Sequence, residues 1–326
     1  MPSRARRGWM ICMTTTAKPD DDRPDVESEP GLPEASIARI AAAVDPHAEG
    51  RDAATLGATL AEATGADLAL VTIEPDLPLV IPGFEWQRVR GETTAMLSET
   101  QDSIAPRARM MIDTDLSIPR GIERLVRRGQ RDLLVVGSSP KAPDGAVWIG
   151  RRTRQLLHEL ECPLVVAARG FSALPAPRLR RIGVGFEGSE ESRLALATAA
   201  TIARGCGAEL TVRAVLDDRI PWLGWRDAYK VAYQDSWEAL MNAEFDSLTS
   251  ICETAVAGLS CGARVDPRRG HPATLLYELS DEVDLLVIGS RRWGPLTRVL
   301  LGGTGEALMH GARCSIMVVP RPHTDS

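Results

Sequence analysis

One segment near the C-terminus carries residue types that bind phosphate: residues 289–304 read GSRRWGPLTRVLLGGT. Glycines let backbone N–H groups approach an anion closely, because no Cβ stands in the way. The run Gly302-Gly303-Thr304 opens a predicted helix over 302–312, and a helix N-terminus favours negative charge. Guanidinium groups also suit phosphate, and the segment supplies Arg291, Arg292 and Arg298. The sequence therefore predicts a phosphate cradle, with a glycine-rich turn and solvated arginines as the alternative.

The start of another predicted helix, over 189–205, has the opposite character. Ser189 is placed to cap it, and Glu190 and Glu191 follow in the first turn. These carboxylates stabilise the helix end and repel phosphate. We therefore expect the phosphates at 289–304, which leaves Glu187 free to face the base or sugar end of a ligand.

The chain contains two copies of one pattern. Residues 132–139, DLLVVGSS, match residues 284–291, DLLVIGSR. Further matches keep the same order along the chain: 40–45 with 182–187, 65–71 with 207–213, Gly150 with Gly302, and Cys162 with Cys314. We therefore predict two homologous units, over 36–168 and 178–321, joined by the proline-containing linker 170–178.

Each unit alternates short aliphatic runs with helical periodicity. In the second unit the predicted strands are 180–186, 210–216, 262–266, 284–289 and 315–319, and the predicted helices are 189–205, 229–257, 271–281 and 302–312. This alternation predicts an α/β fold in which each unit is a doubly wound, five-stranded parallel sheet with helices on both faces. Ligands bind such sheets beyond the carboxyl ends of the strands.

These motifs resemble the universal stress protein family, and the likeness covers nearly the whole chain after the first 35 residues. The hallmark of that family after strand four is G-x-x-G-x(9)-G-[S/T], which Gly289 and Gly302 carry here, and Cys314-Ser-Ile-Met-Val-Val matches its last strand. The resemblance implies a tandem member with two adenine-nucleotide α-hydrolase-like units. It also implies that 163–168 and 315–319 pair within the chain as a pseudo-dimer, and it leaves a homodimer open.

The resemblance implies that the second unit binds ATP or another adenine nucleotide, with Mg²⁺ as an optional companion. By the same likeness, Glu187 lies beside the adenine end and Val215 packs on the adenine. The ribose–phosphate path is then lined by Ile288, Gly289, Gly302, Gly303 and Thr304. Arg292 replaces the second glycine of the hallmark, and it either clamps the phosphates or fills the pocket.

The first unit departs further from the family pattern. Pro140 lacks an N–H, and Arg151 and Arg152 stand where the family has a small hydroxyl residue. Asp45 keeps the acidic position after the first strand. We therefore expect the first unit to be a degenerate half with a structural role.

The sequence shows no evident catalytic base, nucleophile or metal-ligand set, so we interpret the chain as a stress-response sensor or regulatory module rather than an enzyme. Two alternatives stay open: a nucleotide-free scaffold for unidentified protein partners, and a slow ATPase or phosphotransfer protein.

Composition limits the remaining classes of function. With 326 residues, 44% of them hydrophobic, the chain is too apolar for disorder throughout, and no apolar run is long enough to span a membrane. A net charge of −6 and an aromatic content of 4% argue against a nucleic-acid binder. Six scattered cysteines without a secretion signal favour the cytoplasm. Residues 1–35 read as a disordered tail, and we expect translation to begin at Met13.

Overall fold

The computed structural model describes residues 32, 35–75, 83–218, 226–290 and 302–320. Most of the expected tail, the expected start at Met13 and Arg292 lie outside these residues. The first unit contains β1 (Arg39–Ala43), α1 (Ala48–Thr64), β2 (Asp67–Pro75), α2 (Gly83–Ile104), β3 (Arg109–Asp115), α3 (Ile118–Arg128), β4 (Leu133–Gly137), α4 (Arg151–Glu159) and β5 (Leu164–Ala167). After the 3₁₀ helix η1 (Phe171–Ala173), the second unit contains β6 (Arg181–Phe186), α5 (Glu190–Cys206), β7 (Glu209–Leu216), α6 (Arg226–Ala257), β8 (Ala263–Arg269), α7 (Pro272–Ser280), β9 (Leu285–Gly289), α8 (Gly303–Leu308) and β10 (Ser315–Val319).

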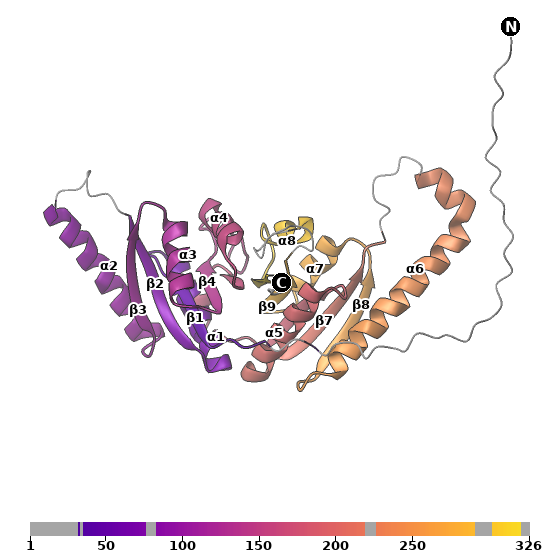
Figure 1. Ribbon diagram of the computed structural model, residues 1–326, viewed down its shortest axis with the longest axis horizontal. Coiled ribbons are helices and arrows are strands. Elements are labelled where there is room, and N and C mark those ends of the chain that lie inside the picture. The colour runs from indigo at the N-terminus through magenta and orange to yellow at the C-terminus, as the bar shows by residue number, and fades with distance from the viewer. Residues whose placement is uncertain (1–31, 33–34, 76–82, 219–225, 291–301, 321–326) are drawn as a thin grey trace, which may run out of the picture. The chain divides into compact units, whose positions relative to one another are not determined.

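Among the described residues, ten strands form one sheet in the order β3-β2-β1-β4-β5-β10-β9-β6-β7-β8 (Figure 1). Neighbouring strands are parallel within each unit. Side chains of α1, α2, α5 and α6 join the core on one face, and those of α3, α4, α7 and α8 join the core on the other. The predicted α/β class, with two doubly wound five-stranded units, is therefore confirmed.

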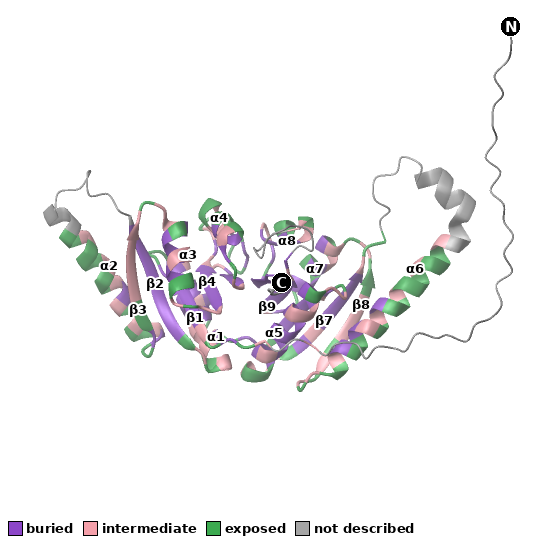
Figure 2. Ribbon diagram, in the orientation of Figure 1, coloured by how far each residue is buried: buried purple, intermediate pink, exposed green. Residues whose placement is uncertain are grey.

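The central strands are buried on both faces, which explains their continuous aliphatic sequences (Figure 2). β4 reads LLVVG and β9 reads LLVIG, and the first four residues of each are buried. The aspartate that precedes each run also has a role. Asp132 Oδ2 accepts the backbone N–H groups of Ala38 and Arg39 at 2.9 and 2.8 Å. Asp284 repeats this arrangement at the start of β6, so the repeated Asp joins the amino ends of neighbouring strands.

The two units join through their last strands, as predicted for a pseudo-dimer. β5 and β10 pair antiparallel, with Val166 opposite Ile316 and Leu164 opposite Val318. All four side chains are fully buried. This pairing covers two sheet edges that each unit would otherwise expose.

Helices and the linker also hold the units together. α1 packs against α5. Asp52 of α1 is almost fully buried, and its carboxylate accepts the backbone N–H groups of Gly170 and Ser172, each at 2.8 Å. The hydroxyl of Ser172 donates to the same carboxylate at 2.6 Å. A buried charge is costly unless it is paired or hydrogen-bonded, so these three donors explain how Asp52 is accommodated.

The final helix is shorter than the predicted 302–312, because α8 ends at Leu308. The residues that follow it bind the first unit instead of continuing the helix. Ile149 N–H donates to Met309 O at 3.0 Å, and Val147 N–H donates to Ala312 O at 2.8 Å. The predicted strand 262–266 is in turn too short, since β8 runs on to Arg269 along β7. Within the described part of the chain, no helix has the length and apolar character needed to cross a membrane.

Candidate functional site

A cavity of about 660 Å³ lies at the carboxyl ends of β6, β7 and β9, where ligands of such sheets bind. Residues from α5, α6, α7 and α8 complete its wall. Six of the eight predicted ligand residues line it: Glu187, Val215, Ile288, Gly289, Gly302 and Thr304. Gly303 stands in the first turn of α8 and is not among the lining residues, and Arg292 lies outside the described part of the chain.

One wall of the cavity is apolar. Val215 and Ile288 project from the sheet, and Leu276 faces them from α7; all three are at least nine-tenths buried. Leu248 and Ile251 of α6 line the cavity from the other face of the sheet. The sequence analysis anticipated the two sheet residues but not the contribution of α6 and α7. Such a surface suits a flat, largely apolar ring.

The glycines around the cavity serve different purposes. At Gly289 an added Cβ would stand 2.9 Å from the carbonyl carbon of Glu191, so this glycine lets the first turn of α5 approach the sheet. Its counterpart Gly137 lies even closer to α1, with the added Cβ 2.2 Å from Glu49 O. An added Cβ at Gly303 meets no atom within 4 Å. Helix packing thus explains the repeated glycine at 137 and 289. At Gly289 the volume that a Cβ would fill is taken by the backbone of α5.

A buried hydroxyl group lies at the same end of the cavity. Ser290 lines it and is 6% exposed, and its Oγ has no hydrogen-bond partner in the described part of the chain. In the first unit the matching Ser138 is fully engaged, because its Oγ accepts Trp148 N–H at 2.8 Å and contacts Trp148 O at 3.3 Å. Ser290 Oγ therefore differs from its counterpart in lacking a partner among the described residues, a difference that sequence comparison of the two units alone did not reveal.

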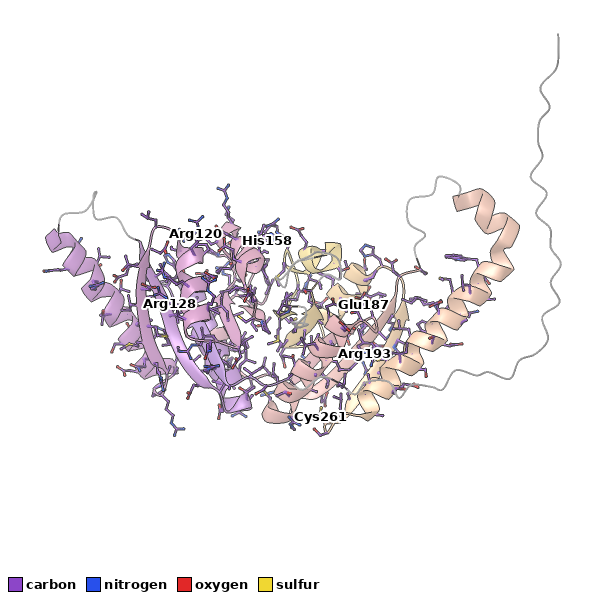
Figure 3. All side chains as sticks on the ribbon, viewed as in Figure 1. Arg120, Arg128, His158, Glu187, Arg193 and Cys261 are labelled. Atoms are coloured by element: carbon purple, nitrogen blue, oxygen red, sulfur yellow. The ribbon has the colours of Figure 1, made fainter. Side chains whose placement is uncertain are left out.

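Charge is unevenly distributed around the cavity. Its described lining contains three carboxylates and no lysine, arginine or histidine; the carboxylates are Glu187, Asp217 and Glu244. Glu187, at the end of β6, is labelled in Figure 3. Ser189 Oγ donates to Glu187 Oε1 at 3.2 Å and accepts Ser192 N–H, which confirms Ser189 as the cap of α5. Like charges repel, so an anionic group fits best at the other end, beside Gly302 and Thr304.

A buried ion pair holds α7 in place beside the cavity. Arg213 of β7 donates to Asp266 Oδ2 from Nη2 at 2.6 Å and from Nε at 2.9 Å. Its Nη1 donates to the carbonyl oxygen of Leu275 at 2.8 Å. Burial raises the pKa of the Asp266 carboxyl, but the hydrogen bonds and charges of Arg213 and Arg268 outweigh it, so that pKa is lowered. Arg213 thereby anchors the helix that presents Leu276 to the cavity.

No group of three or more His, Cys, Asp or Glu side chains able to hold a metal occurs among the described residues. The five described cysteines are free thiols. Burial raises the pKa of Cys162 and of Cys252 to about 12, which keeps both thiols protonated and weakly nucleophilic.

The first unit has a smaller cavity, of about 420 Å³, at the matching place. Asp45 and Gly137 line it, as their counterparts do in the second unit, but so do Pro140, Arg151 and Arg152.

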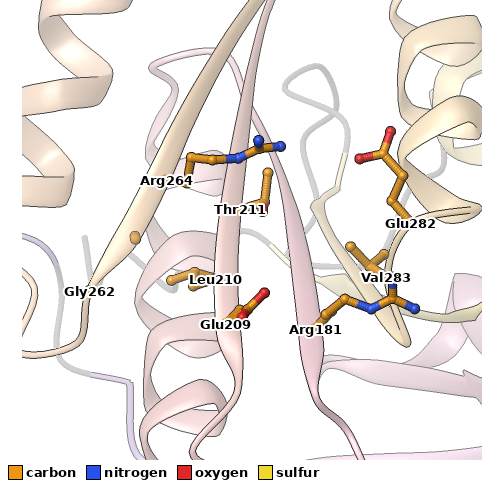
Figure 4. Close-up of a pocket in the computed structure, with 9 residues that line it drawn as sticks. Arg181, Glu209, Leu210, Thr211, Gly262, Arg264, Glu282 and Val283 are labelled. Atoms are coloured by element: carbon orange, nitrogen blue, oxygen red, sulfur yellow. The ribbon is translucent and has the colours of Figure 1, made fainter.

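A further hollow, of about 750 Å³, lies at the amino ends of β6 and β7 (Figure 4). Its side chains carry both signs of charge, with Arg181 and Arg264 beside Glu209 and Glu282, and none of the predicted ligand residues lines it.

Comparison with known proteins gives one family. The model of the "Universal stress protein family" matches twice, over residues 36–168 and 178–320. Universal stress protein Rv2005c of Mycobacterium tuberculosis is 24% identical over 298 residues, which cover 86% of this chain and 96% of that protein. Among solved structures, a universal stress protein from Archaeoglobus fulgidus matches with a TM-score of 0.60 at 15% identity, over 87% of this chain and 98% of that one. A protein of unknown function from Pseudomonas aeruginosa, PA1789, matches with a TM-score of 0.59 at 17% identity, over 87% and 92% of the two chains.

Proposed function

Because the chain belongs to the universal stress protein family, we propose that its second unit binds ATP or another adenine nucleotide and serves as a sensor or regulatory module in the stress response. The observation that carries this proposal is the cavity at the carboxyl ends of β6, β7 and β9. Its volume, about 660 Å³, falls in the usual range for small-molecule sites, which is roughly 300–1,000 Å³.

The cavity suggests one orientation for the nucleotide. The adenine ring packs between Val215, Ile288 and Leu276, which form the apolar wall. The ribose and the polar edge of the base face the carboxylate side, where Glu187 accepts hydrogen bonds. The phosphates point toward Gly302 and the first turn of α8, away from the three carboxylates. Mg²⁺, where present, is held by the phosphates and water, as is usual for this ion.

Several features favour binding over catalysis. The described lining holds no histidine or cysteine, and its carboxylates stand at the end opposite the proposed phosphates. The free cysteines, two of which are buried, also fit a reducing compartment, so we place the protein in the cytoplasm. A nucleotide bound without turnover acts through the conformation it stabilises, which is the role proposed here.

The test compares nucleotide binding by two matched glycine variants. Purified protein is denatured and its supernatant analysed for adenine nucleotide by mass spectrometry, and ATP·Mg²⁺ is titrated into the stripped protein by calorimetry. Gly302→Glu places a carboxylate in the proposed phosphate path, whereas Gly150→Glu places the same carboxylate before α4, where an added Cβ meets no atom within 4 Å.

We expect about one nucleotide per chain, binding lost in Gly302→Glu and binding kept in Gly150→Glu. Binding that survives in Gly302→Glu contradicts the assigned site. Absence of binding up to millimolar ATP rejects the proposal and leaves the scaffold interpretation. Release of phosphate at a rate that Gly302→Glu abolishes identifies a slow ATPase instead.

A further inference from the structure

An arginine of the first unit contacts the helix that borders the cavity of the second unit. Arg154, on α4, is 2.5 Å from Glu306 Oε1 of α8 through its Nη1. Its Nη2 lies 2.9 Å from His310 Nε2, and His310 Nδ1 lies 2.7 Å from the carbonyl oxygen of Glu306. A carbonyl only accepts, so Nδ1 carries the proton and Nε2 accepts from Arg154. The guanidinium is therefore held by two acceptors of the second unit.

The surrounding contacts fix this arrangement. Trp148 packs edge-on against His310, with ring centroids 5.1 Å apart and an interplanar angle of 85°. The backbone bonds from Val147 and Ile149 hold the residues after α8 on either side of that ring. Because α8 has only six residues, it gains little stability from its own turns and depends on its neighbours for its position. These neighbours are α7 and the core of the second unit together with the contacts from the first unit.

Glu306 stands next to the part of the cavity proposed for phosphate. Thr304 and Gly305 line the cavity, and Glu306 follows directly, in the first turn of α8. A carboxylate there repels an approaching anion. Its side chain points across the junction to Arg154 instead, so its charge is paired outside the cavity.

We propose that Arg154 is a positioning residue for the nucleotide site of the second unit: it neutralises Glu306 and holds that carboxylate away from the phosphates. This inference rests on the function proposed above and extends it. It gives the first unit, whose own cavity is smaller and departs from the family pattern, a part in the ligand site of the second. The affinity for the charged nucleotide then depends on the junction between the units.

The experiment measures affinities for ATP and for adenosine by calorimetry on the full chain. The wild type is compared with Arg154→Glu, with the charge-exchanged double variant Arg154→Glu/Glu306→Arg, and with Arg128→Glu. Arg128 is an exposed arginine at the end of α3, shown in Figure 3, and it makes the same change in net charge on another helix.

Loss of an exposed ion pair alone weakens an interaction only a few-fold, but charge reversal also adds a second carboxylate beside the site. We therefore expect Arg154→Glu to weaken ATP binding about tenfold and to change adenosine binding less than about twofold. The double variant is expected to recover ATP binding to within about threefold of the wild type, and Arg128→Glu to leave both affinities unchanged.

Three outcomes overturn the inference, and they separate its failure from a failure of the proposed function. If wild-type protein binds neither ligand, the proposed function fails and the role of Arg154 with it. If the wild type binds ATP and Arg154→Glu binds it equally well, the function stands and the inference alone fails. If Arg154→Glu loses ATP and adenosine in equal measure and the charge exchange restores neither, Arg154 merely supports the fold.

Discussion

The contact between α1 and α5 leaves no room for a side chain at Gly205. At Gly205, near the end of α5, an added Cβ would stand 1.7 Å from the carbonyl oxygen of Ala63 in α1. Both groups belong to helix backbones, so relief requires one helix to move. Overpacking of this kind costs about 1–3 kcal/mol, and a displaced backbone places the cost near the upper end. Alanine regains about 0.5–1 kcal/mol through its better helix propensity. We therefore expect Gly205→Ala to lower the free energy of unfolding by about 2–2.5 kcal/mol.

The matched control is Gly91→Ala in α2. Gly91 is exposed, and an added Cβ there meets no atom within 4 Å, so only the propensity gain remains. We expect this variant to raise the free energy of unfolding by about 0.5–1 kcal/mol. Urea denaturation followed by circular dichroism measures both variants against the wild type. A Gly205→Ala protein as stable as Gly91→Ala would refute the reasoning, because it would mean that α1 and α5 do not approach this closely.

Two further predictions concern the surroundings of the cavity. Gly289→Ala is expected to destabilise the protein by about 1 kcal/mol and to weaken ATP binding, because its Cβ displaces the first turn of α5. Gly303→Ala is expected to change the stability by less than about 0.5 kcal/mol. Equal effects of the two variants in urea denaturation and calorimetry would contradict this. Arg213 and Arg268 lower the pKa of Asp266 despite its burial. The stability that the ionised Asp266 contributes is therefore present above the ordinary carboxyl pKa of about 4 and is lost as the pH falls through the lowered value. Asp266→Asn is therefore expected to lower the Tm at pH 7 and to flatten the decline of Tm between pH 5 and pH 2, and parallel Tm–pH curves for variant and wild type would exclude this role.

The pairing of β5 with β10 shows what a repeat in the sequence predicts about the fold and what it leaves open. The family resemblance led to the prediction that 163–168 pairs with 315–319, and β5 and β10 do pair. The repeat alone shows that the two strands match, but hydrophobic strands do not by themselves specify their neighbours. The close approach at Gly205 and the anchoring of the linker by Asp52 were not foreseen. Both depend on residues far apart in the chain, and neither leaves a local pattern.

Some residues of the candidate site were identified from the sequence, and others were found only in the structure. Glu187 was identified because it follows a strand, and Val215 and Ile288 were named from the family resemblance. All three line the cavity, because the ends of parallel strands gather at one edge of the sheet. The residues that α6 contributes were missed, because helical periodicity predicts a buried face but not the strand it covers. Gly289 was predicted to line the ribose–phosphate path, and it does line the cavity. The structure adds that its missing Cβ lets the first turn of α5 approach the sheet, which the sequence did not indicate.

The sequence by itself determined the two homologous units, their α/β class, the aliphatic strands and the acidic start of α5. These properties are local, because they follow from periodicity, capping and repetition along the chain. Only the tertiary structure decided that α8 ends at Leu308, that the hydroxyl of Ser290 lacks a partner among the described residues, and that Arg154 faces Glu306. Each of these depends on which segments meet in space, and Arg154 and Glu306 stand about 150 residues apart.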